Sequence, residues 1–292
     1  MTKKMTLARA TLSLSALAVV AAARPVGPTR IAGVAGGVRA LAVLPGQTVT
    51  LEATAARPTA GRIAPLGAGR WAWTAPPTPG LYPIKIVAPD GSDSVTVQAF
   101  VVVPFDQLRG EYLNGYRIGR YPRTPPAGFV EVTPANQDVL VSPHFRLKQF
   151  LCKQPGARKY VVVNERLYDA LEYVLAQVNA AGYHATSFHV MSGYRTPAYN
   201  RSLGNVVFSQ HQWGSAADIF IDENGDGRMD DLNGDGRSDI RDAEVLYRII
   251  DAAAARSEGQ GLIGGIGKYA PTSAHGPFVH VDVRPGGGHA RW

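Results

Sequence analysis

The sequence predicts two folded parts, a small all-β domain followed by a larger α+β domain. Short segments of alternating apolar and polar residues fill residues 37–104, which is typical of strands. Two segments with helical apolar spacing occur later, the first after residue 160. Strand and helix patterns do not alternate in a sustained way in that later part, so a doubly wound parallel sheet is not expected.

Residues 1–23 have the features of a secretory signal peptide. Three basic residues precede an apolar run from Leu12 to Val20, and small alanines follow it. The run is too short for a permanent bilayer-spanning helix, and an uncleaved membrane anchor is the alternative. Residues 24–36 are rich in Pro, Gly and Ala and are predicted to be a linker. We therefore expect an exported, periplasmic or extracellular protein with no stable membrane span after cleavage.

The net charge and the single cysteine limit the kinds of partner that we expect this chain to bind. The formal net charge is +7, and removal of the three basic residues in 1–23 lowers it to +4. A mildly basic chain suits anionic cell-envelope polymers. The sequence has no long basic run or aromatic-basic interleaving, so nucleic acid is not an expected partner. The single cysteine, Cys152, follows Phe150 and Leu151, which favours a buried thiol over an intermolecular link.

Residues 37–104 are predicted to form a small immunoglobulin-like sandwich. The strand candidates are QTVTLEA, GRWAWTA, LYPIKIVA and DSVTVQAFVVV, with turns at Pro79-Gly80 and Asp90-Gly91. Trp71 and Trp73 lie on one face of the second candidate. Packing in the core or between domains is the favoured interpretation of this pair, and a stacking surface for sugars is the alternative.

The second domain is predicted to span residues 142–292, after a structured connector at 105–141. An apolar stripe predicts a helix that Asn164 caps and Gly182 ends. A second helix is expected from about Asp242 to Ser257. The segments FHVMSG and PFVHVDVR are strand candidates, and the second places Phe278, His280 and Asp282 on one face.

His211 and Asp218 are candidate metal ligands. Zinc binds imidazole nitrogen and carboxylate oxygen, and a catalytic zinc keeps one position open. The small residues at 214–217 would let the backbone fold closely round an ion. A third ligand must come from elsewhere, and His280 on the last strand is the best candidate. The alternative is a buried histidine that only satisfies a hydrogen bond.

Three ordered motifs carry a family resemblance: SGYRTPAYN at 192–200, SQHQWGSAAD at 209–218 and GPFVHVDVR at 276–284. Together they resemble the zinc D-Ala-D-Ala metallopeptidase family of cell-wall enzymes, whose members include D-Ala-D-Ala carboxypeptidases and murein endopeptidases. The resemblance is strongest to the endopeptidase branch, and it spans residues 142–292.

The resemblance implies a hedgehog-like, D,D-peptidase-like α+β zinc domain. It implies that His211, Asp218 and His280 are the zinc ligands. It also implies that Arg195 steadies the charged transition state, a role that suits a permanent cation with fork geometry. The implied substrate is a peptidoglycan stem peptide or cross-link. Tyr194, in the same motif, is expected to be a packing residue.

The general base is less well defined. Related enzymes carry an acid three residues before the last zinc histidine, or a histidine two before it. Here Pro277 and Phe278 occupy those positions, and neither can carry a proton. His275 is therefore the predicted base, and Asp282 is predicted to orient His280 or to take a proton. If neither acts as a base, the domain would bind zinc without cutting peptides.

Ser209 is a further candidate near the ligands. Its side chain is predicted either to orient His211 or to cap a turn.

The acidic run after Ile221 is predicted to be a separate calcium site. Its spacing fits two overlapping calcium loops that contain Asp222, Asn224, Asp226, Asp230, Asp231, Asn233, Asp235, Asp239 and Asp242. Gly227 and Gly236 would permit the sharp turns. A solvated acidic loop with Asp-Gly turns is the alternative. Calcium would be structural and would hold the segment between Asp218 and the second helix.

These features support three functions. The favoured one is an exported zinc peptidase that acts on peptidoglycan, and both carboxypeptidase and endopeptidase action are compatible with the motifs. The first alternative is a non-catalytic zinc- and calcium-binding module that attaches to the cell wall. The second is a β-sandwich adhesin whose C-terminal domain is stabilised by calcium alone.

Overall fold

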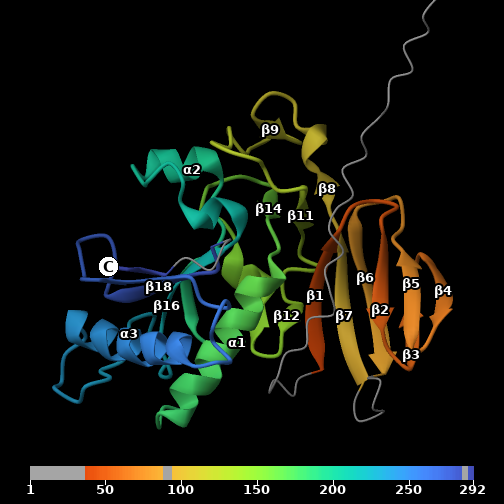
Figure 1. The fold of residues 1–292 in the computed structure, drawn as a ribbon. Coiled ribbons are helices and arrows are strands. Elements are labelled where there is room, and N and C mark those ends of the chain that lie inside the picture. Colours follow the sequence, from red (N-terminus) through yellow and green to blue (C-terminus); the bar gives the residue numbers. More distant parts are fainter. Residues whose placement is uncertain (1–36, 88–93, 285–288) are drawn as a thin grey trace, which may run out of the picture.

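The computed structural model describes residues 37–87, 94–284 and 289–292 (Figure 1). The predicted signal peptide, linker and Asp90-Gly91 turn lie outside the described residues. Among the helices of the described ranges, none combines the length and the apolar character that a bilayer crossing requires.

The N-terminal part consists of two sheets that share one apolar core. The first has the strand order β1-β7-β6-β3 and the second β2-β5-β4. Strand β1 runs parallel to β7, and the other neighbours are antiparallel. The strands are β1 (Val38–Val43), β2 (Thr48–Glu52), β3 (Ala55–Pro58), β4 (Arg62–Gly67), β5 (Arg70–Thr74), β6 (Gly80–Val87) and β7 (Ser94–Val101). The all-β prediction therefore holds for this part, and its immunoglobulin-like character stays a prediction.

The two tryptophans of β5 pack within the protein. Trp73 is fully buried in the core between the sheets, and its indole donates to the carbonyl of Ala60 at 2.9 Å. Trp71 is half-buried and donates to the carbonyl of Ala53 at 3.0 Å. These contacts agree with the packing interpretation of the pair, since a sugar-stacking surface needs exposed rings.

The following segment contains short strands and belongs to the core of the second part. The strands are β8 (Val103–Pro104), β9 (Tyr112–Leu113), β10 (Tyr116–Arg117), β11 (Gly128–Val132), β12 (Leu140–Ser142), β13 (Phe145–Arg146) and β14 (Lys159–Val161), with 3-10 turns η1 (Phe105–Gln107) and η2 (Leu147–Phe150). Leu113, Ile118 and Phe129 share one apolar cluster with α1 and the later strands. The predicted connector at 105–141 is thus part of that core, and the predicted domain boundaries remain predictions.

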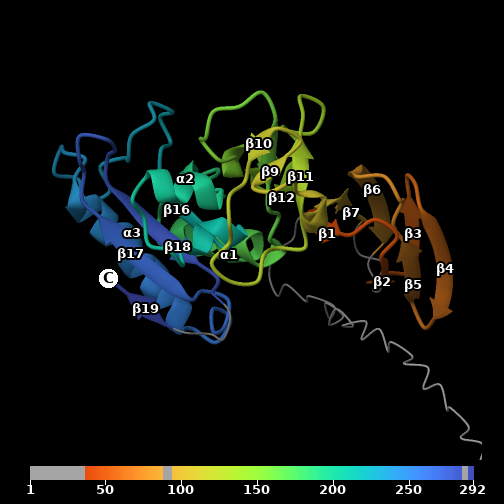
Figure 2. The ribbon, with the colours of Figure 1, turned by 90° about the horizontal axis from the view of Figure 1, so that it is seen from above.

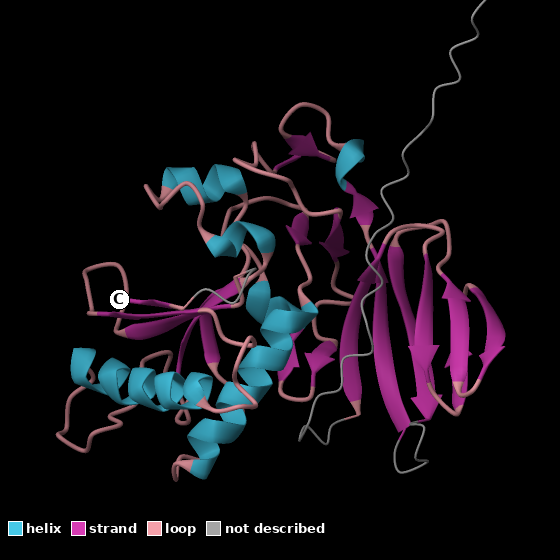
Figure 3. Ribbon diagram, in the orientation of Figure 1, coloured by secondary structure: helices cyan, strands magenta, loops and turns pink. Residues whose placement is uncertain are grey.

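The C-terminal part is a five-stranded sheet covered by helices (Figure 3). The sheet order is β15-β16-β18-β17-β19. Its elements are α1 (Glu165–Ala180), β15 (His189–Ser192), α2 (Pro197–Ser202), η3 (Gln210–Trp213), β16 (Ala216–Phe220), α3 (Ile240–Ala255), β17 (Gly265–Tyr269), β18 (Phe278–Asp282) and β19 (Ala290–Arg291). Helix α3 lies against β17 and β18, and α1 lies against α3. The predicted α+β class agrees with this mixed architecture.

The helix ends differ from the prediction in two places. Asn164 stands at the N-cap position of α1, but its side-chain amide donates to the hydroxyl of Ser215 at 2.8 Å and so ties α1 to β16. Helix α3 begins two residues earlier than predicted because Asp239 and Asp242 form a capping box at its start.

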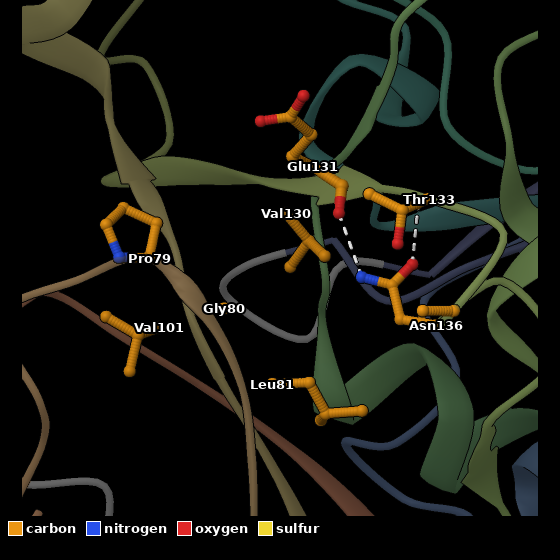
Figure 4. Close-up of a pocket in the computed structure, with 9 residues that line it drawn as sticks. Pro79, Gly80, Leu81, Val101, Val130, Glu131, Thr133 and Asn136 are labelled. Carbon is orange, nitrogen blue, oxygen red and sulfur yellow. Dashed lines mark hydrogen bonds between the residues drawn. The ribbon is translucent and has the colours of Figure 1, made fainter.

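The two parts meet where β1 lies beside α1. Arg39 pairs with Asp169 at 3.1 Å, and the amide of Ala42 donates to Glu165 at 2.6 Å. Figure 2 shows the β part at one end of the molecule and α3 with β17 and β19 at the other. A cleft of about 420 Å³ also lies between the parts, with residues of β6 on one side and Asn136 on the other (Figure 4).

Candidate metal centre

Local backbone structure brings the three predicted zinc ligands together. Asp218 on β16 and His280 on β18 are direct cross-strand partners, so their side chains leave the same face of the sheet. His211 lies on η3, immediately before β16. Gly214 joins these elements with φ of +61°, and a Cβ there would lie well under 3.0 Å from the carbonyl of Val162. The corner that aims His211 at the sheet therefore requires glycine.

The ligand atoms form a compact, buried cluster. Nε2 of His211 lies 3.2 Å from Oδ1 of Asp218 and 3.2 Å from Nδ1 of His280. Nδ1 of His280 lies 2.8 Å from the same Asp218 oxygen. Tetrahedral zinc with bonds of about 2.0–2.1 Å separates its ligand atoms by about 3.3 Å. Two nitrogens and one oxygen at these separations fit a zinc ion.

Hydrogen-bond partners fix which nitrogen of His211 is free and how the ring of His280 is oriented. Nδ1 of His211 lies 2.6 Å from the carbonyl of Gly193, and a carbonyl only accepts, so Nδ1 carries the proton. His280 lies between two carboxylates: its Nδ1 is 2.8 Å from Oδ1 of Asp218, and its Nε2 is 3.4 Å from Oδ2 of Asp282. The unprotonated Nε2 of His211 therefore points into the cluster, as a metal-binding histidine requires. His280 presents its Nδ1 to the same point while Asp282 faces its other nitrogen.

The environment also sets the charges of the cluster. Burial lowers the pKa of His211, the charge of Arg195 lowers it further, and Asp218 only partly opposes both. Burial alone would raise the pKa of Asp218, but the contacts with His211 and His280 more than offset it, so the pKa lies well below its usual value. Burial alone would lower the pKa of His280, but the contacts with Asp218 and Asp282 outweigh burial and raise it. The anionic Asp218 beside the neutral His211 suits a divalent cation, and His280 must lose its Nδ1 proton when it binds one.

Arg195 lies within the cluster, next to a ligand. Its Nη2 forms an ion pair with Oδ2 of Asp218, and its Nε donates to the hydroxyl of Ser192 at 2.8 Å. Its backbone amide donates to the carbonyl of His211 at 3.1 Å. The guanidinium therefore orients Asp218, a contact that the sequence did not predict, and it brings a permanent positive charge to the cluster. Tyr194, its neighbour, is a buried core residue, as expected.

Asp282 is suited to hold His280 rather than to accept a proton. Its Oδ1 accepts from the amide of Gly265 at 2.9 Å and from Nε of Arg284 at 2.9 Å. Burial alone would raise its pKa, but the contacts with Arg284 and His280 outweigh burial and lower the pKa. Of the two roles predicted for Asp282, this geometry favours orientation of His280.

His275 lies in the loop before β18, apart from the ligand cluster. Its Nδ1 contacts the carbonyl of Gly276 at 2.8 Å, and its ring meets the ring of Phe278 edge to face at 5.0 Å. Within the described ranges, the metal-ligand cluster consists of His211, Asp218 and His280. The base role of His275 stays a prediction.

Several contacts of the metal centre were not predicted from the sequence. The carbonyl of Gly193 contacts Nδ1 of His211, and Ser209, for which two roles were open, stands at the N-cap position of η3 with no side-chain capping bond. Arg284 supports Asp282. The ring of Trp292 lies 5.3 Å from the ring of His280. A backbone carbonyl leaves no signal in the residue type, but Arg284 stands two residues after Asp282 in the last motif.

The acidic run after β16 forms two loops with the same hydrogen-bond pattern. Asp222 accepts from the amides of Asp226 and Gly227, and Asp231 accepts from those of Asp235 and Gly236. The other predicted calcium ligands also contact backbone amides. They are Asn224, Asp226, Asp230, Asn233, Asp235, Asp239 and Asp242. These carboxylates and amides are thus engaged by the backbone, and calcium at the loops stays a prediction.

Comparison with known proteins agrees with this site. The model of the peptidase M15 family matches residues 143–233. The match includes His211 and Asp218, and it supports the predicted zinc D-Ala-D-Ala metallopeptidase family, whose α+β architecture fits the C-terminal part. A search of curated proteins found no significant match.

Proposed function

We propose that this chain is an exported zinc metallopeptidase that hydrolyses peptide bonds in peptidoglycan stem peptides or cross-links. The match to peptidase M15 supports a metallopeptidase, and the features of residues 1–23 support export. The observation that carries the proposal is the buried cluster in which His211, Asp218 and His280 turn their ligand atoms to one point.

Zinc would be held by Nε2 of His211, Oδ1 of Asp218 and Nδ1 of His280. When bound, zinc supplies Lewis acidity, which polarises a peptide carbonyl and makes water a stronger nucleophile. The contacts with Gly193 and Asp282 hold the rings of His211 and His280 in the ligating orientation.

The side chains around the cluster supply the remaining chemistry. Arg195 places a permanent cation beside Asp218, where it can stabilise negative charge that grows on the substrate oxygen. His275 is the proposed group that moves a proton. Asp282 stays ionised and holds His280.

One observation favours the alternative of a wall-binding module without activity. Pro277 and Phe278, at the positions where related enzymes carry an acid or a histidine, are buried. The contacts of His275 with Gly276 and Phe278 turn it towards its own loop. In this alternative the zinc fold would be retained for attachment to the wall.

Digestion of purified peptidoglycan separates the two functions. We expect the wild-type protein to release muropeptides and His211→Ala to release none, while His184→Ala, at an exposed site, serves as the matched control. His275→Ala should lower the rate by about 10²–10⁴-fold if it is the base and should retain zinc. A wild-type protein that pellets with the wall and releases no muropeptide would contradict the peptidase.

We also propose that the two acidic loops bind calcium with a structural role. The repeated spacing and the left-handed glycines, such as Gly227 and Gly236, support this proposal, because calcium loops turn sharply at such a residue. Calcium should raise the melting temperature of the wild-type protein, and Asp222→Asn combined with Asp231→Asn should remove the effect. An identical melting temperature with calcium and with chelator would exclude it.

A further inference from the structure

An exposed aromatic pair flanks the metal centre on the His280 side. The ring of Trp292 lies 5.3 Å from the ring of His280 with an interplanar angle of 45°. Trp292 is 45% exposed and Tyr269 is 37% exposed. Large aromatic side chains are usually more buried than this, so their exposure beside a buried ligand cluster indicates a contact surface.

Several contacts hold Trp292 in place. Its indole N–H donates to the hydroxyl of Tyr269 at 2.6 Å. Its backbone extends the β17–β19 pairing, with its amide bonded to Ile266 and its carbonyl to the amide of Lys268. The guanidinium of Arg284 lies 5.8 Å from its ring. Backbone pairing in the sheet and these side-chain contacts therefore fix the position of the Trp292 ring.

Gly267 makes room for this ring. A Cβ at Gly267 would lie well under 3.0 Å from the indole of Trp292. Gly267 is also the cross-strand partner of His280. The sheet therefore accommodates the indole directly beside a metal ligand.

Tyr269 extends the surface along the same strand. Its ring stacks on Phe278 at 4.6 Å with an interplanar angle of 8°. Since Phe278 is buried and covers one face of Tyr269, the exposed area of Tyr269 lies away from that contact. Phe278 and His280 alternate onto one face of β18, so the aromatic surface is continuous with the metal centre.

The chemistry of the Trp292 and Tyr269 side chains indicates which kind of ligand they would bind. Rigid aromatic rings with polar edges suit a ligand that has a flat C–H face and a hydroxylated rim, as a pyranose has. We propose that Trp292 and Tyr269 form a subsite for a pyranose ring of the glycan strand whose peptide is cleaved at the metal centre. This inference rests on the proposed function.

Binding of a chitooligosaccharide, a probe that has sugar rings and no peptide, tests the subsite directly. NMR titration of the wild-type protein should show saturable shifts. Trp292→Ala should weaken binding by about tenfold, which corresponds to ~1.4 kcal/mol, and Tyr269→Ala should also weaken it. Tyr112→Ala, at an aromatic residue with 47% exposure in β9, is the matched control and should bind as the wild type does. Absence of wild-type binding, or equal binding by Trp292→Ala, would overturn the subsite.

Kinetics distinguish a subsite from simple support of His280. The ratio of kcat/KM for a disaccharide-linked peptide to that for the free peptide should fall about tenfold in Trp292→Ala and recover in Trp292→Phe. An equal loss for both substrates would mean that Trp292 only supports the metal ligand. Sugar binding without any peptide cleavage would refute the peptidase function and leave the sugar subsite standing. Peptide cleavage without sugar binding would refute the subsite and leave the peptidase function standing.

Discussion

Replacement of Asp282 by Asn should weaken the metal centre, because it removes the anion that fixes His280. The carboxylate is buried, accepts from Gly265 and Arg284 through Oδ1, and faces Nε2 of His280 through Oδ2. Asparagine has one acceptor oxygen. Its amide nitrogen would therefore place a donor against a donor, either at His280 or at Arg284.

The structure sets the size of the effect. A hydrogen bond to a charged group contributes about 1.5–3 kcal/mol, and loss of a group that orients a metal ligand lowers metal affinity by about 10–100-fold. We expect the zinc dissociation constant of Asp282→Asn to rise within that range. Without metal, its free energy of unfolding should fall by about 2 kcal/mol near neutral pH.

The effect on stability should depend on pH. The pKa of Asp282 in the folded state is lowered, so its contribution is present above the unfolded pKa of about 3.9 and disappears as pH falls through the lower folded value. The free energies of unfolding of the wild type and of Asp282→Asn, measured in urea, should therefore become equal in acid.

Zinc affinity of this variant is measured by competition with a chelator. Asp251→Asn is the matched control, because Asp251 pairs with Arg291 at 2.6 Å and is not a contact of the centre described above. The control should keep wild-type zinc affinity. Unchanged zinc affinity in Asp282→Asn would refute the proposed support of His280.

Two further predictions concern stability, both measured by urea unfolding. Gly214→Ala should lower the free energy of unfolding by more than ~2 kcal/mol. The alanine would carry the left-handed strain of about 1–2 kcal/mol and would also collide with Val162, whereas Gly234→Ala, with open space around it, carries the strain alone. Equal losses in the two variants would contradict this. Burial raises the pKa of Glu165 despite the bond from Ala42, so its contribution is present below the unfolded value of about 4.3 and is lost as pH rises through the folded value. Glu165→Gln should thus gain stability relative to wild type between acid and neutral pH, and a constant difference would contradict the pKa direction.

The regular elements were predictable because their side-chain periods are local. Alternation identified β2, β5, β6 and β7, and the stripe from Leu167 to Val178 identified α1. The segment 105–141 was not predictable in the same way. Its strands are mostly two or three residues long and gain their place from pairing with distant residues, as Val130 does with Val161, so no local period marks them.

The residues of the candidate site were predictable from the sequence, but the hydrogen bonds and ring contacts that hold them were not. The spacing of the motifs identified His211, Asp218 and His280. The carbonyl of Gly193 carries no sequence signal, and the pairing of Arg195 with Asp218 depends on how β15 and β16 align. Trp292 reaches His280 only because β19 pairs with β17, which a short C-terminal strand does not reveal.

A zinc titration of chelator-stripped protein, with mass spectrometry of the products from a defined cross-linked muropeptide, tests the central claim most directly. The wild-type protein should be inactive without zinc, and cleavage should rise to saturation at one zinc per chain. His211→Ala should stay inactive throughout. Cleavage that does not depend on zinc, or full occupancy of the site by zinc without any cleaved product, would contradict the account.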